Sequence, residues 1–305
     1  MKKSVSILVK QRVYYRIAGF LIAVESDDAK KTERLLPNFA SFRVKNEEAT
    51  CKGGENLLFC LSCNESVYVM KDMTIADDFR WNGIRYEVYR NVEGEQLIRM
   101  RKNDNCRLLH ADKGWKLPVT DVTLKGETEN EFLNNFLIVS FGMASALFST
   151  LKLHASVIEK EGRALLFLGK SGTGKSTHSR LWQQYVPGCS LLNDDEPVVR
   201  VNERDEVTVY GTPWSGKTPC YRNEKARVAA FVLLHQSPEN RLTKLSAKEA
   251  FFTLFASSSM MRSDVHHKNA VFATLAAILE HVPVYRLDCR PDREAVSLTE
   301  SLLFL

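Results

Sequence analysis

The most restrictive feature of the sequence is a glycine-rich octapeptide, Gly169-Lys170-Ser171-Gly172-Thr173-Gly174-Lys175-Ser176. It matches the GxxxxGK[ST] pattern of a phosphate loop in full. The apolar run Ala164–Leu168 precedes it and the helix-compatible segment Lys175–Tyr185 follows it. In that context, backbone N–H groups of the turn and the positive end of the helix dipole can surround a phosphate. The context disfavours the alternative, a connecting turn that matches by chance.

The pattern assigns roles to individual residues of the loop. Lys175 is expected to bridge the terminal phosphates of a nucleoside triphosphate, and the Ser176 hydroxyl to ligate magnesium. ATP and Mg²⁺ are therefore the expected cofactors. The residues predicted to bind the nucleotide are Gly169, Lys170, Ser171, Gly172, Thr173, Gly174, Lys175, Ser176 and Thr177.

An acidic triplet, Asp194-Asp195-Glu196, follows the loop after an interval that fits one helix and one returning strand. Two adjacent carboxylates beside a phosphate can serve two purposes, binding of the metal ion and acceptance of a proton. Of Asp194 and Asp195, one is predicted to hold the metal and the other to accept the proton of an attacking hydroxyl. An acidic turn at a strand end is the alternative, which the complete loop disfavours.

His154 lies on the strand predicted to pair with the strand of the loop, which makes it a further candidate catalytic residue. A lone histidine is, however, more often a packed side chain.

Two cations follow the acids in the segment 211–222. Its small residues, with Trp214, Lys217 and Arg222, suit a loop that covers an anionic substrate. Lys217 and Arg222 could neutralise charge on a transferring phosphoryl group. An ordinary surface loop with two solvated bases is an equally weighted alternative.

The length of 305 residues favours two domains. Residues 1–126 are predicted to form a β-rich, antiparallel domain with a helix near Asp28–Leu36, because short apolar runs alternate there with turn signals such as Asn82-Gly83. The predicted strands of this domain lie in the runs Val13–Val24, Leu57–Leu61, Val67–Met70, Ile84–Tyr89 and Leu97–Met100.

Residues 127–305 are predicted to form the phosphate-loop domain, which begins with an apolar helix ending near Leu151. Strands and helices alternate after it, so the fold class is α/β. The predicted strands are His154–Glu159, Ala164–Leu168, Ser190–Val201, Glu206–Tyr210 and Ala229–Leu234. The predicted helices are Lys175–Tyr185, Ala247–Ser257 and Asn269–Leu279.

Composition excludes several classes of protein. Hydrophobic residues make up 44% and charged residues 26%, as in ordinary soluble domains, and a net charge of +5 is too small to favour nucleic-acid binding.

Seven scattered cysteines without a leading apolar segment indicate reduced thiols and a cytoplasmic protein. Cys60 and Cys63 lack the second pair of a zinc site. No charge lies between Glu131 and Lys152, but polar residues such as Asn134 and Ser140 favour a buried helix over a membrane span.

Two related families share these motifs. The segment Gly169–Ser179 with Asp194-Asp195-Glu196 resembles the kinase-1 and kinase-2 motifs of ATP-dependent phosphoenolpyruvate carboxykinase. The order of His154, loop and double aspartate resembles HPr kinase/phosphorylase, and the resemblance covers about residues 150–215. It implies a phosphate-loop kinase domain in which Asp195 is similar to the residue that deprotonates the acceptor hydroxyl. It also implies that Ser176 and Asp194 serve the metal and that His154 lies by the acceptor or the phosphates.

The expected function is transfer of the γ-phosphate of ATP to a hydroxyl of a protein, a peptide or a small metabolite. The resemblance implies a small hydroxyl compound such as free serine as one such acceptor. Thr208-Val209-Tyr210 stands where HPr kinase has a glutamate, which disfavours the HPr protein as acceptor. A nucleotide-binding regulatory protein without turnover and a carboxykinase-like decarboxylation are the alternatives. Neither nucleic acid nor membrane is expected as a partner, and the oligomeric state, a homo-oligomer included, stays open.

Overall fold

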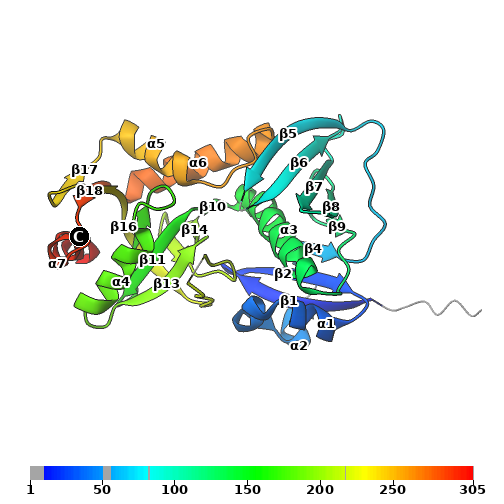
Figure 1. Cartoon of the computed structure of the whole chain (residues 1–305), viewed down its shortest axis with the longest axis horizontal. Helices are drawn as coiled ribbons and strands as arrows, with labels where there is room; N and C mark the ends of the chain where they lie inside the picture. Colours follow the sequence, from blue (N-terminus) through cyan, green and yellow to red (C-terminus); the bar gives the residue numbers. More distant parts are fainter. Residues whose placement is uncertain (1–9, 51–55, 82, 217, 305) are drawn as a thin grey trace, which may run out of the picture. The chain divides into compact units, whose positions relative to one another are not determined.

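The chain divides into two compact units, Met1–Ala144 and Ser145–Leu305. In this computed structural model the described residues are 10–50, 56–81, 83–216 and 218–304. Each unit is built on a mixed β-sheet with helices packed against it, so the α/β fold class is confirmed (Figure 1).

The first unit contains a sheet with the strand order β3-β1-β2-β4-β9-β8-β7-β6-β5. Its strands are β1 (Gln11–Ile17), β2 (Phe20–Ser26), β3 (Arg43–Val44), β4 (Phe59–Ser62), β5 (Thr74–Trp81), β6 (Ile84–Arg90), β7 (Gln96–Lys102), β8 (Asn105–Ala111) and β9 (Val119–Thr120). Its helices are α1 (Ala29–Leu35), the 3₁₀ helix η1 (Pro37–Phe42), α2 (Asn46–Thr50) and α3 (Glu127–Ser145). Most pairs are antiparallel, as expected, but β4 pairs in parallel with both β2 and β9.

Local sequence signals account for several of these elements. The run Val13–Val24 forms the β1–β2 hairpin, because Ala18 and Gly19 adopt the positive φ angles, 49° and 83°, of a tight turn. The side chain of Asp28 caps α1 by accepting a hydrogen bond from the Lys31 amide at 3.1 Å. The strand expected at Val67–Met70 is wrong, since these residues pair with no neighbouring strand within the described part of the chain.

Helix α3 belongs to the first unit, although the sequence placed its boundary at residues 126/127. Its polar side chains pair with this unit's own sheet: Glu131 lies 2.6 Å from Lys102, and Asn135 accepts from the Tyr86 hydroxyl at 2.7 Å. Phe141 meets the ring of Phe20 edge to face. These contacts explain why the division falls at 144/145, after the helix.

The segment Thr128–Phe148 is long and apolar enough to cross a membrane by length and composition. Its most apolar 18-residue window is 56% buried, and the polar pairs of α3 described above lie along the segment. Such a helix is also what the core of a soluble domain contains.

The second unit has the strand order β10-β14-β15-β16-β12-β11-β13, with β18 paired to both β16 and β17. Its strands are β10 (Thr150–Lys152), β11 (Ala155–Lys160), β12 (Arg163–Leu168), β13 (Ser190–Asp195), β14 (Val198–Val201), β15 (Val207–Tyr210), β16 (Lys225–Gln236), β17 (Arg241–Lys244) and β18 (Val284–Cys289). Its helices are the 3₁₀ helix η2 (Ala146–Phe148), α4 (Lys175–Tyr185), α5 (Ala247–Ser257), α6 (Val265–His281), α7 (Arg293–Glu300) and the 3₁₀ helix η3 (Ser301–Phe304).

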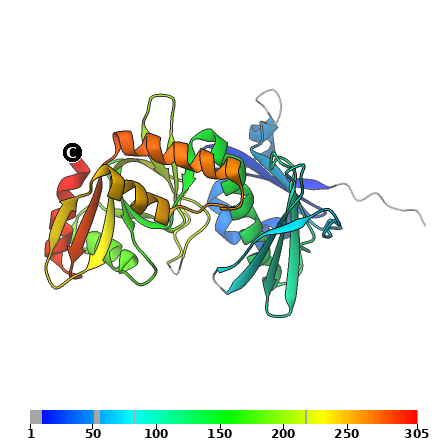
Figure 2. The same cartoon turned by 90° about the horizontal axis from the view of Figure 1, so that it is seen from above.

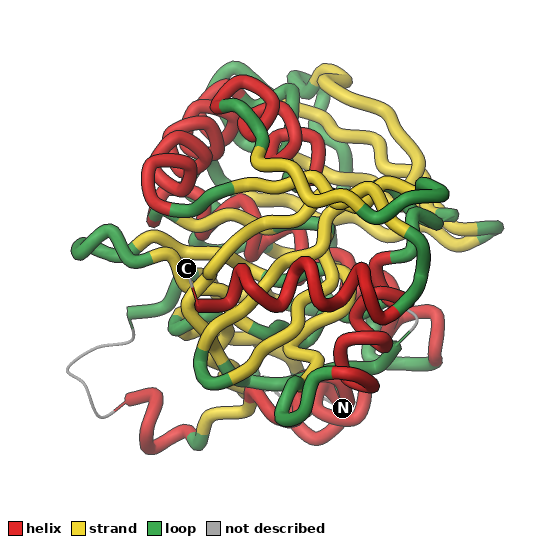
Figure 3. Tube along the Cα trace, turned by 90° about the vertical axis from the view of Figure 1, so that its left-hand side faces the viewer, coloured by secondary structure: helices red, strands yellow, loops and turns green. Residues whose placement is uncertain are grey.

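Helices cover both faces of this second sheet (Figures 2 and 3). On one face, Phe167 of β12 packs in a cluster with Trp182 of α4 and Val296 of α7. On the other, Leu166 packs in a cluster with Leu254 of α5 and Leu275 of α6. The alternation of successive β12 side chains between two helical layers explains why the strand is apolar throughout.

The sequence located most elements of the second unit. β11 and β12 pair as expected, and the helices Lys175–Tyr185 and Ala247–Ser257 have the expected bounds. The strand expected over Ser190–Val201 is instead two strands, β13 and β14, interrupted at Glu196-Pro197 because proline fixes φ and has no N–H for a ladder. The helix expected to end near Leu151 stops at Ser145, and β17, β18 and α7 were not predicted.

Candidate functional site

The residues between β12 and α4 form a tight glycine-dependent turn. Gly169 has a φ of 144°, and a Cβ there would lie 2.5 Å from the Thr173 hydroxyl oxygen. That hydroxyl donates to the Lys170 carbonyl at 2.9 Å and closes the loop. Gly174, at a φ of 104°, is the N-cap of α4 and offers no side-chain cap. The first N–H groups of α4 therefore open toward the loop, as an anion requires.

Lys175 is 8% exposed, and its ammonium group is enclosed by the turn. Its Nζ donates to the Gly169 carbonyl at 2.8 Å and lies 2.9 Å from Nε2 of His154. Burial lowers the pKa of this ammonium, while the charges of Asp195 and Asp194 oppose the shift. A cation in this position has few competing water contacts, so its attraction to a phosphate is strengthened.

The acidic residues reach the loop because of the sheet topology. β11 is antiparallel to both β12 and β13, so β12 and β13 run in the same direction and end at the same edge. The Ser176 hydroxyl consequently donates to Oδ1 of Asp194 at 3.1 Å. A hydrogen bond of 2.8 Å between Ser156 of β11 and Ser179 of α4, both fully buried or nearly so, fixes the helix on the sheet.

His154 connects Lys175 to Asp195. Its Nδ1 lies 2.8 Å from Oδ1 of Asp195, on the ring side opposite Lys175. Because an ammonium can only donate, Nε2 accepts from Lys175 and the hydrogen of the neutral ring is on Nδ1, the nitrogen on the side of Asp195. The sequence placed His154, Lys175 and the two aspartates in one site, and these contacts bring all of them together.

Asp195 has an unusual backbone conformation, with a φ of 135°. Its neighbour across a backbone bridge is Ser215, and the Gly216 amide donates to the Asp194 carbonyl at 2.6 Å. A Cβ at Gly216 would lie 3.2 Å from the Cβ of Asp195, so the loop approaches closely only because this residue is glycine. A non-glycine residue held at such a φ stores strain, as is common at functional sites.

A buried amide and hydroxyl hold the 211–216 loop against β13. Asn193, fully buried, donates to the Thr212 hydroxyl and to the Trp214 carbonyl, both at 3.2 Å. Its carbonyl oxygen accepts from the Glu196 amide at 3.1 Å, and the Thr212 hydroxyl donates to the Glu196 carbonyl at 2.8 Å. The network determines where the loop passes over the acids.

Three further ligand atoms lie close together beside Asp194. One atom each from His154, Asp195 and Glu196 falls within 4.8 Å of the others, which is close enough to hold a metal ion. Glu196 is also 2.8 Å from the Lys152 ammonium, which leaves it partly neutralised. Hydroxyl and carboxylate oxygens are the ligands that magnesium prefers, so Ser176 with Asp194 fits that ion better than the group containing histidine.

Three segments of the site were not anticipated from the sequence. The backbone of Ser257–Ser259 runs beside His154, whose amide donates to the Ser257 carbonyl at 2.8 Å. The residues 236–238 and 289–291 border the loop on its other side and line a pocket with it. Both of the latter segments follow strands parallel to β12, so recognition of β18 as a strand would have located them.

The two candidate cations do not strengthen the site. Arg222 donates to Ser190 and to the Leu191 carbonyl, both at 2.8 Å, at the beginning of β13. The acids lie at the other end of that strand, roughly 17 Å away at the usual rise per residue. Lys217 lies outside the described residues.

The fold and site together define an α/β protein with a phosphate loop at one sheet edge. No protein-family model matches the sequence, and no curated protein matches it either. Among solved structures, the chain is similar to the HPr(Ser) kinase/phosphatase from Coxiella burnetii, with 14% identity and a TM-score of 0.29 over 50% of this chain and 88% of that one. At this TM-score the similarity carries no argument about activity, which rests on the geometry of the site.

Proposed function

We propose that this chain is a magnesium-dependent phosphotransferase that moves the γ-phosphate of ATP to a hydroxyl group. The observation that supports it best is the convergence of Ser176–Asp194 and Lys175–His154–Asp195 on one end of the phosphate loop. A loop that only bound nucleotide would not need a carboxylate held by histidine beside the transferable phosphate. Phosphoryl transfer consists mainly of such positioning and charge stabilisation.

In this mechanism Asp195 is the general base. The acceptor oxygen attacks the γ-phosphorus, the bond from phosphorus to the β–γ bridging oxygen breaks, and ADP leaves with the electron pair. The acceptor's proton passes to Asp195, one of whose oxygens is held by His154, which leaves the other for the acceptor. Lys175 stabilises the negative charge on the phosphoryl oxygens.

Ser176 and Asp194 would hold the magnesium ion, which would neutralise negative charge on the phosphates of the nucleotide. Their oxygens lie 3.1 Å apart, which places two oxygen ligands side by side. Removing the Asp194 carboxylate should therefore weaken the binding of magnesium rather than the binding of the nucleoside.

Transfer from γ-labelled ATP tests the proposal. Free serine, related hydroxyl metabolites, synthetic serine peptides and lysate proteins serve as acceptors, with and without magnesium. We expect labelled acceptor in the wild type, loss of transfer in Lys175→Ala, and a decrease of about 10²–10⁴-fold in Asp195→Asn. Asp205→Asn, an exposed aspartate of the turn between β14 and β15, is the matched control and should keep full activity.

The outcomes separate the alternatives. Nucleotide binding with no labelled acceptor and no ADP formation would contradict the phosphotransferase and favour a regulatory role. Nucleotide consumption that needs oxaloacetate would indicate the carboxykinase-like reaction instead.

A further inference from the structure

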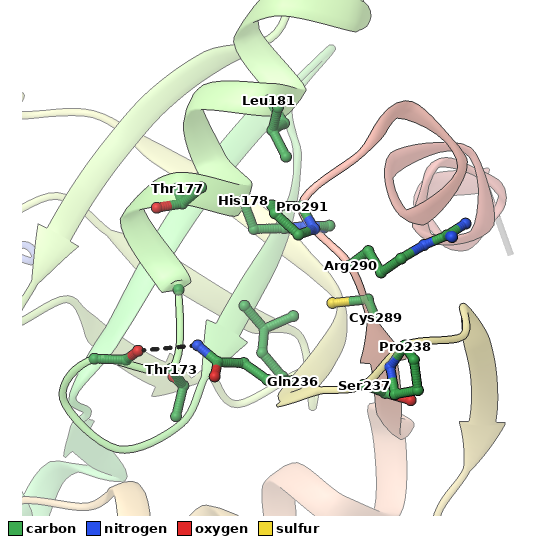
Figure 4. Close-up of a pocket in the computed structure, with 13 residues that line it drawn as sticks. Thr173, Thr177, His178, Leu181, Gln236, Ser237, Pro238, Cys289, Arg290 and Pro291 are labelled. Atoms are coloured by element: carbon green, nitrogen blue, oxygen red, sulfur yellow. Dashed lines mark hydrogen bonds between the residues drawn. The ribbon is translucent and has the colours of Figure 1, made fainter.

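A pocket of about 540 Å³ adjoins the phosphate loop (Figure 4). Thr173 and Thr177 form its border with the loop, and the residues that follow β16 and β18 form its opposite wall. Its volume lies within the range of roughly 300–1,000 Å³ that small-molecule sites occupy. None of the catalytic residues proposed above is among the described residues that line it.

The order of strands determines which part of a nucleotide this pocket can take. At the sheet edge the sequence of strand ends is β13, β11, β12, β16 and β18. Asp194 and Asp195 end β13, the loop follows β12, and the pocket lies against Gln236 and Cys289, which end β16 and β18. A triphosphate on the loop must present its terminal phosphate to the acids, so its other end points at the pocket.

We propose that this pocket binds the nucleoside and favours adenine over guanine, an inference that rests on the proposed binding of a nucleoside triphosphate. Leu181, Leu234 and Pro291 provide apolar surface for a planar ring. His178 adds a side wall that is 3% exposed and stacked edge to face on Phe167. Its Nε2 has no hydrogen-bond partner in the described structure, and burial lowers the pKa of the ring, which favours an uncharged wall.

Gln236 is the base-reading residue of this proposal. Its amide nitrogen lies 3.4 Å from the Gly172 carbonyl, a weak contact that leaves the side chain available at the loop (Figure 4). A glutamine amide matches the donor–acceptor edge of adenine, N6 and N7, whereas guanine presents two acceptors there. No carboxylate is among the described residues that line the pocket, and a carboxylate is the side chain that could accept from both the N1–H and N2 donors of guanine.

Arg290, which could recognise guanine, is turned to other partners. Its guanidinium lies 3.2 Å from Asp292 and 3.4 Å from Glu294. Figure 4 shows the guanidinium directed away from the loop. The charge of Arg290 is therefore used at the beginning of α7 rather than in the pocket.

Calorimetric titration with magnesium and three probes, ATP, GTP and inorganic tripolyphosphate, tests the inference. Leu181→Trp and Ser237→Trp fill the pocket from opposite walls, and Gln184→Trp places the same ring on the exposed side of α4 as a control. We expect both filling variants to raise the Kd of ATP at least about tenfold with the Kd of tripolyphosphate unchanged. We expect Gln236→Leu to reduce the wild-type preference for ATP over GTP.

Each failure has a distinct meaning. Unchanged ATP affinity in both filling variants would overturn the nucleoside pocket while leaving the phosphotransferase intact. Equal affinity of the wild type for ATP and GTP, or an unchanged preference in Gln236→Leu, would overturn the proposal that Gln236 recognises adenine in preference to guanine. A wild type that binds neither ATP nor tripolyphosphate would remove the proposed function and this inference together. Because tripolyphosphate binding reports an intact loop, it also identifies a filling variant that has merely misfolded.

Discussion

Single residues of the site are buried titratable side chains or have a strained backbone, both of which are uncommon at ordinary surface positions. Lys175 and His178 are buried, and Asp195 has a backbone conformation that side chains disfavour. Each condition has a cost in stability that the packing around it must offset. These costs can be measured without knowing the phosphate acceptor.

The buried imidazole of His178 should make the protein sensitive to acid. Burial lowers its pKa from 6.5 to about 4, so the unfolded state takes up the proton first as the pH falls. Stability is therefore complete above pH 6.5 and decreases as the pH falls from 6.5 toward 4. Linkage gives a loss on the order of 2 kcal/mol between pH 7 and pH 5. Urea unfolding at both values should show this loss in the wild type and a smaller one in His178→Phe. His266→Phe, at an exposed histidine of α6, should retain the wild-type loss.

The strain at Asp195 can be separated from its chemistry. Glycine adopts a φ of 135° without a Cβ penalty, whereas alanine does not. Asp195→Gly should therefore be more stable than Asp195→Ala by about 1–2 kcal/mol, although both variants lose the proposed base. Denaturant unfolding of the pair measures the difference, and equal stabilities would show that the position is relaxed.

At the scale of elements, the geometry of the candidate site depends on how the 211–216 loop is attached to β13. Thr212 is fully buried and bonds to both Asn193 and the Glu196 carbonyl. Thr212→Val keeps the shape of the side chain but leaves these groups without their partner. We expect a loss of about 1–3 kcal/mol in unfolding free energy. Thr208→Val, on β15 and half-exposed, is the matched control and should change little. A small loss in Thr212→Val would show that the loop is held by its backbone alone.

The sequence predicts elements well where one local pattern determines them. Ala164–Leu168, the glycines of the loop and the helix Lys175–Tyr185 follow from apolar runs, turn chemistry and helix spacing. β18 and β5 were missed for different reasons. The buried and half-buried side chains of β18 do not alternate regularly, and β18 is a strand because it pairs with β16. β5 is exposed along most of its length. Non-local pairing and edge position override local preference in both.

The site itself was predictable in composition but not in arrangement. His154 could be assigned beside the loop because it directly precedes β11, which pairs with the strand of the loop, and the acids because they lie at the end of β13, the next strand along. Arg222 could not be excluded, since only the register of β13 shows that its partners lie at the far end of that strand. The pocket formed by residues from three separate segments of the chain has no local signature at all.

At the scale of the whole molecule, every described residue of the proposed site lies within Ser145–Leu305. A ligand that binds only the native state stabilises what it binds. Mg·ATP at about 100 times its Kd should raise the unfolding free energy by about 2.7 kcal/mol. Hydrogen exchange should locate this protection at β12, α4 and the ends of β13, β16 and β18.

The N-terminal sheet provides the internal comparison for that measurement. Amides of β6 and β7, paired with each other in the first unit, should exchange at the same rate with and without the nucleotide. Lys175→Ala should remove the protection in the second unit and leave β6 and β7 unchanged. Protection of β6 and β7 by Mg·ATP would instead show that the first unit also takes part in nucleotide binding, and the site would then extend beyond the residues that form the loop, the acids and the pocket.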